Sequence, residues 1–209
     1  MIYLYAISEL PPSRQGAPGL DGAPLCATCA GGLHAVHSEH DVLDVTPTAT
    51  ALMAHEAVVD ELLGAGAILP FRFGTALESE RQLRELLERE QERFRALLAR
   101  VRGRVELAVR VSVPSELAPA TNGASYLSAK LARRRAGDQV LKPLEAFAAE
   151  TARPASVDDP FIKASFLVPD ADVERFAGAV RELQRSHPQL TLSCTGPWPP
   201  YSFVAEGSS

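Results

Sequence analysis

Two cysteines and the histidines that follow them are the residues best suited to chemistry. Cys26 and Cys29 are separated by two residues, and His34 and His37 come soon after them. Zinc prefers thiolate and imidazole ligands, and two cysteines at this spacing are a recurrent ligand pair. In the strand predicted here, however, residues three apart point to opposite faces. We therefore interpret these side chains as small buried thiols and surface histidines, with a zinc- or ligand-binding site as the alternative.

The other titratable residues do not form a recognisable catalytic pattern. Redox-active cysteine pairs lie at the start of a helix, which is not where Cys26 and Cys29 are predicted. His55 lies on the apolar face of a predicted helix, without an evident nucleophile or orienting carboxylate. We expect it in the core or at a domain interface, with one hydrogen-bond partner. The basic run 133–135 fans around a helix and is expected on a solvated face. We therefore expect neither catalysis nor a cofactor.

Two aromatic segments are the candidates for binding a partner. Leu69–Thr75 would place Phe71 and Phe73 on one face of a strand, with Arg72 opposite. In Thr195–Val204, prolines flank Trp198 and stiffen the backbone before Tyr201. Such rings either pack on the protein's own sheet or serve as amphipathic anchors for a partner. The candidate partner-binding residues are Phe71, Arg72, Phe73, Trp198 and Tyr201.

Composition excludes several classes of function. Of 209 residues, 46% are hydrophobic and 22% charged, enough apolar material for a core. The 21 basic and 26 acidic residues leave a net charge of −5, which disfavours a nucleic-acid partner. No apolar run approaches the length of a membrane span, and the first residues lack the basic start of a signal peptide. We expect a cytoplasmic protein whose three cysteines are reduced, with no membrane partner.

The pattern of strands and helices predicts an α+β fold in two domains, residues 1–102 and 103–209. Each would be a small, mostly antiparallel sheet with helices on one face, with ferredoxin-like elements. In the first domain we predict strands over 2–7, 25–30, 32–38 and 67–72, a helix capped by Thr46, and a long helix from Thr75 or Ser79 to Gly103. In the second we predict strands over 105–113, 161–168 and 190–195, and helices within 124–151 and over 170–186.

The two aromatic segments also carry a family resemblance. The stretches T-G-P-W-P-P-Y-S-F-V and L-P-F-R-F-G-T resemble hallmarks of the gas vesicle F/L proteins. Matching positions elsewhere are Tyr3-Leu4-Tyr5-Ala6-Ile7, Leu52-x-x-His55-x-x-Val58-Val59, Val105-Glu106, Tyr126-Leu127-x-x-Lys130 and Ala164-x-Phe166-Leu167-Val168. The chain departs from the pattern in Cys26-x-x-Cys29 and in a shorter stretch between Lys130 and Phe161.

This resemblance implies a two-domain α+β protein, without catalysis, that is required for making gas vesicles. We expect it to bind the small apolar A-type shell subunit, whose free apolar face would aggregate in water, and other gas vesicle accessory proteins. A monomer or weak oligomer is expected. The resemblance leaves open the F or L type, and whether the protein is a transient chaperone in the cytoplasm or stays on the shell, for instance on its gas-facing surface.

Overall fold

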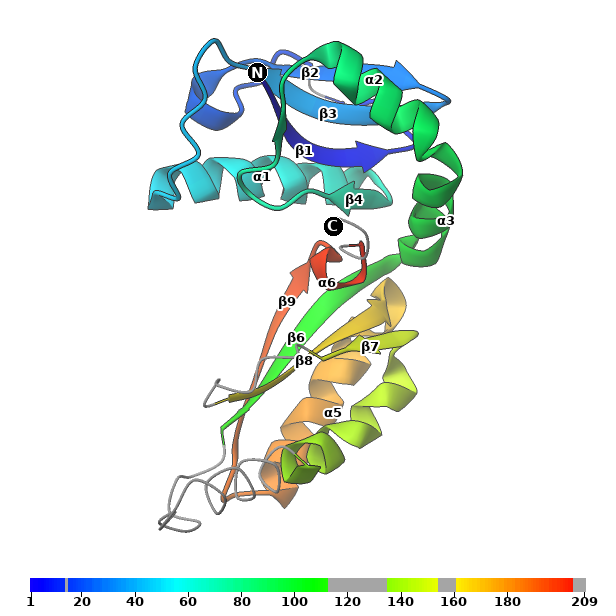
Figure 1. Cartoon of the computed structure of the whole chain (residues 1–209). Coiled ribbons are helices and arrows are strands. Elements are labelled where there is room, and N and C mark those ends of the chain that lie inside the picture. Colours follow the sequence, from blue (N-terminus) through cyan, green and yellow to red (C-terminus); the bar gives the residue numbers. More distant parts are fainter. Residues whose placement is uncertain (14, 113–134, 154–160, 205–209) are drawn as a thin grey trace, which may run out of the picture. The chain divides into compact units, whose positions relative to one another are not determined.

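The structure is a computed structural model that describes residues 1–13, 15–112, 135–153 and 161–204 (Figure 1). The chain divides into two compact units. Unit 1 comprises Met1–Arg104 together with the C-terminal residues from Pro199, and unit 2 comprises Val105–Trp198. The second domain was expected to hold every residue from 103 onward, whereas the described residues 199–204 belong to unit 1.

Unit 1 is built on an antiparallel sheet. Its strands are β1 (Ile2–Ser8), β2 (Leu25–Ala30), β3 (Leu33–Glu39), β4 (Ile68–Pro70) and β5 (Ala76–Leu77). Four of them lie in the order β2-β3-β1-β4, and β5 also pairs with β1. A short 3-10 turn, Leu20–Gly22, precedes β2. The strands predicted over 25–30 and 32–38 are confirmed and pair as an antiparallel hairpin. Its turn, Gly31-Gly32, has positive φ at both glycines, 58° and 72°, as a tight turn requires.

Three longer helices and one short one complete unit 1. They are α1 (Ala49–Ala65), α2 (Glu80–Arg89), α3 (Gln91–Val101) and α6 (Tyr201–Val204). Ser79 caps α2 as predicted, accepting the Gln82 N–H at 3.3 Å. The predicted cap of α1 was wrong by two residues: Thr48 accepts the Ala51 N–H at 3.1 Å. The backbone N–H of Thr46 instead donates to the Asp44 carboxylate at 2.8 Å.

The single long helix predicted up to Gly103 is instead two helices. They meet at Glu90, whose φ of −99° and ψ of 12° depart from helical values. The Glu90 carboxylate receives hydrogen bonds from Arg89 at 3.0 Å and Arg93 at 3.3 Å. The break allows α2 to pack along β2 while α3 contacts β4. An amphipathic pattern runs through both helices, so it does not reveal the change of direction.

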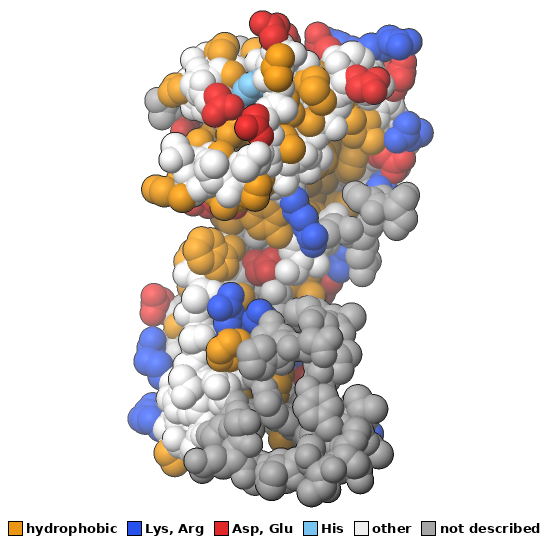
Figure 2. Space-filling view, turned by 60° about the vertical axis from the view of Figure 1, so that its left-hand side comes forward, with side chains coloured by type: hydrophobic (Ala, Val, Ile, Leu, Met, Phe, Trp, Pro, Cys, Tyr) orange, Lys and Arg blue, Asp and Glu red, His pale blue; other side chains and the backbone are white. Residues whose placement is uncertain are grey.

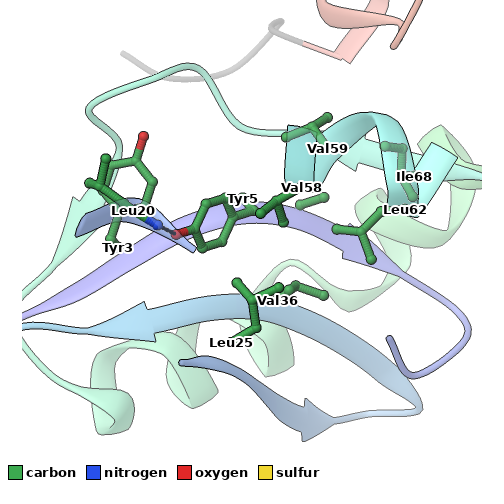
Figure 3. Packing of buried hydrophobic residues seen from close by; sticks show 10 residues of the cluster. Tyr3, Tyr5, Leu20, Leu25, Val36, Val58, Val59, Leu62 and Ile68 are labelled. Carbon is green, nitrogen blue, oxygen red and sulfur yellow. Dashed lines mark hydrogen bonds between the residues drawn. The ribbon is translucent and has the colours of Figure 1, made fainter. Parts of the chain in front are cut away.

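The core of unit 1 lies between β1 and α1. Every residue of β1 is buried, and Tyr3 and Tyr5 belong to one core cluster with Val58, Val59 and Leu62 of α1 (Figure 3). The Tyr5 hydroxyl lies deep in this core and accepts the Leu20 N–H at 2.7 Å, so its polar atom is satisfied. Side chains alternate across a sheet, and α2 covers the opposite face, where Thr28 donates to Glu80 at 3.2 Å.

Unit 2 has a ferredoxin-like arrangement. Its elements are β6 (Arg104–Ser112), helical residues 135–141 continuing into a 3-10 segment (Lys142–Phe147), β7 (Glu150–Ala152), β8 (Phe161–Pro169), a 3-10 turn (Asp170–Asp172), α5 (Val173–Ser186) and β9 (Thr191–Trp198). The strand order is β7-β8-β6-β9, so the two central strands are the first and third of a β-α-β-β-α-β unit. The α+β fold class predicted from sequence is confirmed.

One face of this sheet packs on α5. Phe166 of β8 and Phe176 of α5 meet with their ring centroids 5.1 Å apart. Val109 and Val111 of β6 are fully buried in the same core, as the alternating pattern of that strand predicted. The helix predicted within 124–151 was wrong at its end, because residues 150–152 form a strand. Its first part, including Tyr126, Lys130 and the arginines at 133 and 134, lies outside the described residues.

The helices described by the structure include none that combines the length and the apolar character needed to cross a bilayer.

Candidate functional site

Side chains from four separate segments of unit 1 meet at His55, and we call them the His55 cluster. Its members are Tyr3 and Tyr5 of β1, His55 of α1, Phe73 and the backbone of residues 71–74, and Tyr201 of α6. All four segments belong to the sequence stretches that carry the family resemblance. His55 is fully buried, so its polar atoms depend on these neighbours for hydrogen bonds.

The hydrogen bonds fix the protonation of His55. Its Nε2 lies 3.1 Å from the carbonyl oxygen of Phe71, which accepts only, so Nε2 carries the proton and donates. Nδ1 then accepts from the Tyr3 hydroxyl at 2.8 Å. Burial lowers the pKa of His55, and the hydrogen bond to Phe71 partly opposes that effect. The imidazole is therefore neutral, with both nitrogens occupied.

Tyr3 extends this chain of hydrogen bonds to the loop that follows β4. Its hydroxyl accepts the backbone N–H of Gly74 at 3.4 Å while it donates to His55. Burial raises the pKa of Tyr3 to about 12, so the phenol keeps its proton and remains a donor near neutral pH. The His55 side chain and the Tyr3 hydroxyl thus hold the backbone of the loop at Phe71 and at Gly74.

Ring packing reinforces the polar contacts. Tyr5 stacks on His55 with an interplanar angle of 25° and centroids 5.6 Å apart. Tyr3 and Phe73 approach the imidazole edge-on, with centroid distances of 5.7 Å and 5.9 Å. Edge-to-face and offset contacts of this kind add stability beyond the buried area. The cluster is thus a rigid junction of β1, α1, the loop after β4 and α6.

Tyr201 attaches the C-terminal segment to this junction. Its hydroxyl lies 3.4 Å from Oε1 of Glu56 and 3.5 Å from Nε2 of His55. Because Nε2 already carries a proton, the hydroxyl donates to Glu56. Burial raises the pKa of Tyr201, and the neighbouring Glu56 raises it further. Burial also raises the pKa of Glu56, and the charge of Asp60 adds to this shift.

The cluster is built for structure and not for acid–base chemistry. A general base must present a free nitrogen to a substrate, whereas both nitrogens of the buried His55 bond to the protein itself. His55 lies in the core as expected, but the expectation of one hydrogen-bond partner was wrong. Tyr3 and Tyr5 were expected only as part of the family resemblance and not as members of a site. The available signal was two tyrosines in an otherwise apolar strand, because buried phenols need polar partners.

Four of the five candidate partner-binding residues lie in unit 1, and Trp198 lies in unit 2. Phe71 and Phe73 are half-buried and Arg72 is exposed, but β4 ends at Pro70, so the prediction that the two rings share one face of a strand was wrong. Phe73 packs against His55, and Tyr201 belongs to the same cluster. Trp198 is the last residue of β9 in unit 2, and its side chain is 44% exposed.

The cysteines and histidines of the β2–β3 hairpin are paired across the two strands. Cys26 lies opposite His37 and Cys29 opposite His34. The expected buried thiols and surface histidines were wrong in part, because Cys29 is exposed and His37 is buried. Among the described residues, no group of three or more potential metal ligands comes together.

His37 is a second buried neutral histidine. The Thr28 hydroxyl donates to Glu80, so it accepts from Nε2 of His37 at 3.0 Å. Nδ1 of His37 then has only a lone pair and no hydrogen-bond partner. Burial lowers the pKa of His37, and the nearby charges of Glu39 and Glu80 oppose the shift. Protonation of His37 in the folded protein would therefore place a positive charge on a buried ring.

We predict that the protein loses stability as the pH falls below about 6.5, the ordinary histidine pKa. The pKa values of His37 and His55 are lowered in the folded state, so the unfolded chain binds more protons below that pH. Each histidine would contribute up to about 1.4 kcal/mol per pH unit, down to its folded pKa. Urea unfolding between pH 7.5 and 5.5 measures this slope. His37→Asn should flatten it, and a free energy of unfolding that stays constant over this range would contradict the prediction.

Comparison with known proteins identifies a family and two solved structures of the same fold. The family model described as "Gas vesicle synthesis protein GvpL/GvpF" matches residues 1–130 and 125–205. Two crystal structures share the fold: gas vesicle protein GvpF from Anabaena sp. PCC7120, with a TM-score of 0.82 at 21% identity, and GvpF from Microcystis aeruginosa, with a TM-score of 0.80 at 20% identity. The first similarity covers 99% of this chain and 96% of the other, and the second covers 97% and 98%.

Relatives in sequence carry both F and L names. Gas vesicle protein F2 of Halobacterium salinarum is 31% identical over an alignment of 177 residues that covers 82% of this chain and 76% of that protein. Gas vesicle protein L of a Streptomyces species is 27% identical over an alignment of 249 residues that covers 97% of this chain and 92% of the relative. The resemblance inferred from the aromatic segments is confirmed, and the chain belongs to the gas vesicle GvpL/GvpF family.

Proposed function

We propose that this protein is a non-enzymatic assembly factor that binds the small, apolar shell subunit during gas vesicle formation. Membership of the GvpL/GvpF family supports the gas vesicle role, and the family is described as one of gas vesicle synthesis. The occupied nitrogens of His55 support a binding role over catalysis at the buried cluster. Other gas vesicle accessory proteins are further proposed partners.

The proposal addresses a physical problem, the aggregation of free shell subunits in water. A shell that holds gas and excludes water needs subunits with a large apolar face, and such subunits aggregate when free in water. A factor that covers this face, or starts the first ring, removes the obstacle. We place it in the cytoplasm while it escorts the subunit and on the gas vesicle if it remains bound. It would act as a monomer or weak oligomer.

The exposed Trp198 is the observation that carries the proposal. A tryptophan offers a large apolar surface with a polar N–H and is a frequent anchor of protein interfaces. Trp198 pairs with Glu106 of β6. The register of the two strands shifts between this pair and the next pair, Ala108 and Thr195. At the neighbouring Gly196, φ is 120°, and a Cβ there would lie 2.7 Å from the Glu106 carbonyl oxygen. The two strands therefore approach closely where the indole is presented.

We predict that Trp198→Ala weakens binding of the shell subunit at least about thirtyfold, the equivalent of about 2 kcal/mol for an interface anchor. The melting temperature should change little, because the side chain is already 44% exposed. Co-purification and titration with shell subunit measure the first quantity, and thermal unfolding the second. Phe161→Ala is the matched control, since that aromatic side chain in the same unit is 42% exposed. Equal subunit affinity in wild type and Trp198→Ala would remove Trp198 from the interface.

A further inference from the structure

Unit 1 carries an exposed surface that is both apolar and acidic, which we call the α1 patch. It runs along residues 41–48 and along α1 as far as Asp60. Its apolar members are Val42, Val45, Leu52 and Met53, and its acidic members are the exposed Asp41, Asp44 and Asp60 and the half-buried Glu56. Val42 exposes 88% of its surface and Met53 72%. Leaving such side chains together in water is unfavourable, so the patch is a candidate for contact with another molecule.

The shape of the patch suits a helix. On α1, the row Ala49, Met53 and Ala57 is exposed at i, i+4 spacing, while His55 and Val59 point into the core. The small alanines on either side of Met53 let another helix approach the α1 backbone, and the flexible methionine adapts to the side chains it meets. The segment 41–48, which enters α1 at its cap, Thr48, carries the exposed Val42 and Val45 directly before this row in the chain.

The charge of the patch selects the partner. Residues 15–71 contain no lysine or arginine, but they contain seven acidic residues: Asp21, Glu39, Asp41, Asp44, Glu56, Asp60 and Glu61. In Figure 2, which turns this side forward, hydrophobic and acidic side chains cover the upper part of the view, and basic side chains lie at its right margin and lower border. An acidic helix would be repelled here, whereas a basic one is attracted as its apolar side is covered.

We propose that the α1 patch binds an amphipathic helix whose apolar stripe is flanked by lysine or arginine. The stripe covers Leu52, Met53 and Val45, and the basic side chains meet Asp41, Glu56 and Asp60. This inference rests on the proposed function and deepens it. It names the α1 patch as the binding surface of this chain and a basic amphipathic helix as the part of the partner that contacts it. Helix-in-groove and helix-on-helix recognition both follow this division between apolar anchors and a charged rim.

The first test uses two designed 18-residue helical peptides that differ only in having lysine or glutamate beside the same leucine stripe. The full-length protein should bind the lysine peptide and not the glutamate peptide, more tightly at low salt because exposed charges are screened at high salt. Met53→Ser should weaken lysine-peptide binding at least about fivefold, through loss of the apolar contact. Asp41→Lys combined with Asp60→Lys should weaken it at least about tenfold, through charge repulsion.

The matched control is Glu88→Lys combined with Glu92→Lys, which changes the net charge equally at exposed positions on α2 and α3. It should leave lysine-peptide affinity within about twofold of wild type at 150 mM salt, where distant charges are screened. Circular dichroism and melting temperature confirm that each variant folds. Equal weakening by the control and the patch variants, or no weakening by the patch variants, would overturn the assignment of the α1 patch.

A second arm separates this inference from the proposed function. Each variant is produced together with the shell subunit, and the amount of subunit that co-purifies is measured. Loss of subunit from the patch variants but not from the control supports both proposals. Retention by every variant overturns the patch while the proposed function stands. Absence of shell subunit from wild-type protein that still binds the lysine peptide at the patch overturns the proposed function alone.

Discussion

Replacing His55 by alanine is expected to lower the free energy of unfolding by about 3 to 5 kcal/mol. The change leaves a cavity among Tyr3, Tyr5 and Phe73, as large-to-small core substitutions do. It also removes the hydrogen-bond partner of the buried Tyr3 hydroxyl and of the Phe71 carbonyl. Urea or thermal unfolding at pH 7.5 measures the loss.

Two further variants divide this loss into its parts. Tyr3→Phe keeps the ring and removes only the hydroxyl, so it should cost about 1 to 2 kcal/mol. Glu88→Ala, a replacement at an exposed position of α2, should change the stability by less than about 0.5 kcal/mol. If His55→Ala were no more destabilising than Glu88→Ala, the His55 cluster would not be the junction described here.

Replacing Phe203 by alanine is expected to destabilise unit 1 by about 3 kcal/mol or more, although the residue lies near the C-terminus. The Phe203 side chain is buried, and its carbonyl accepts from Arg100 of α3 at 3.3 Å. Pro199 and Pro200 are buried as well, and Tyr201 bonds to Glu56. The segment therefore packs as part of unit 1, and truncation of the Phe203 side chain leaves a void there.

Hydrogen exchange locates the effect. In Phe203→Ala, amides of β1 and α1 should exchange faster, because the opening free energy of unit 1 falls, while amides of α5 should keep their protection. The control is Trp198→Ala. Trp198 is five residues from Phe203 in the chain but is exposed and belongs to unit 2, so its replacement should leave the protection of β1 unchanged. Faster exchange in α5 with unchanged β1 would show that the C-terminal segment stabilises the other unit.

The elements set by local chemistry were predictable from the sequence alone. Positive-φ glycines mark the β2–β3 hairpin, Ser79 satisfies the first amides of α2, and strict alternation identifies β6 as a half-buried strand. These signals work because each depends on residues within a few positions of one another. The aromatic segments with their prolines and glycines identified the family in the same way, as local patterns read directly from the chain.

The contacts that make the site were decided by tertiary structure. His55 bonds to Tyr3 across 52 residues and lies beside Tyr201 across 146 residues, and no local pattern encodes which of several buried polar groups will meet. The sequence by itself determined the family, the fold class and which side chains need burial or hydrogen bonds. Only packing decided the partners, because those contacts form after distant segments have been brought together.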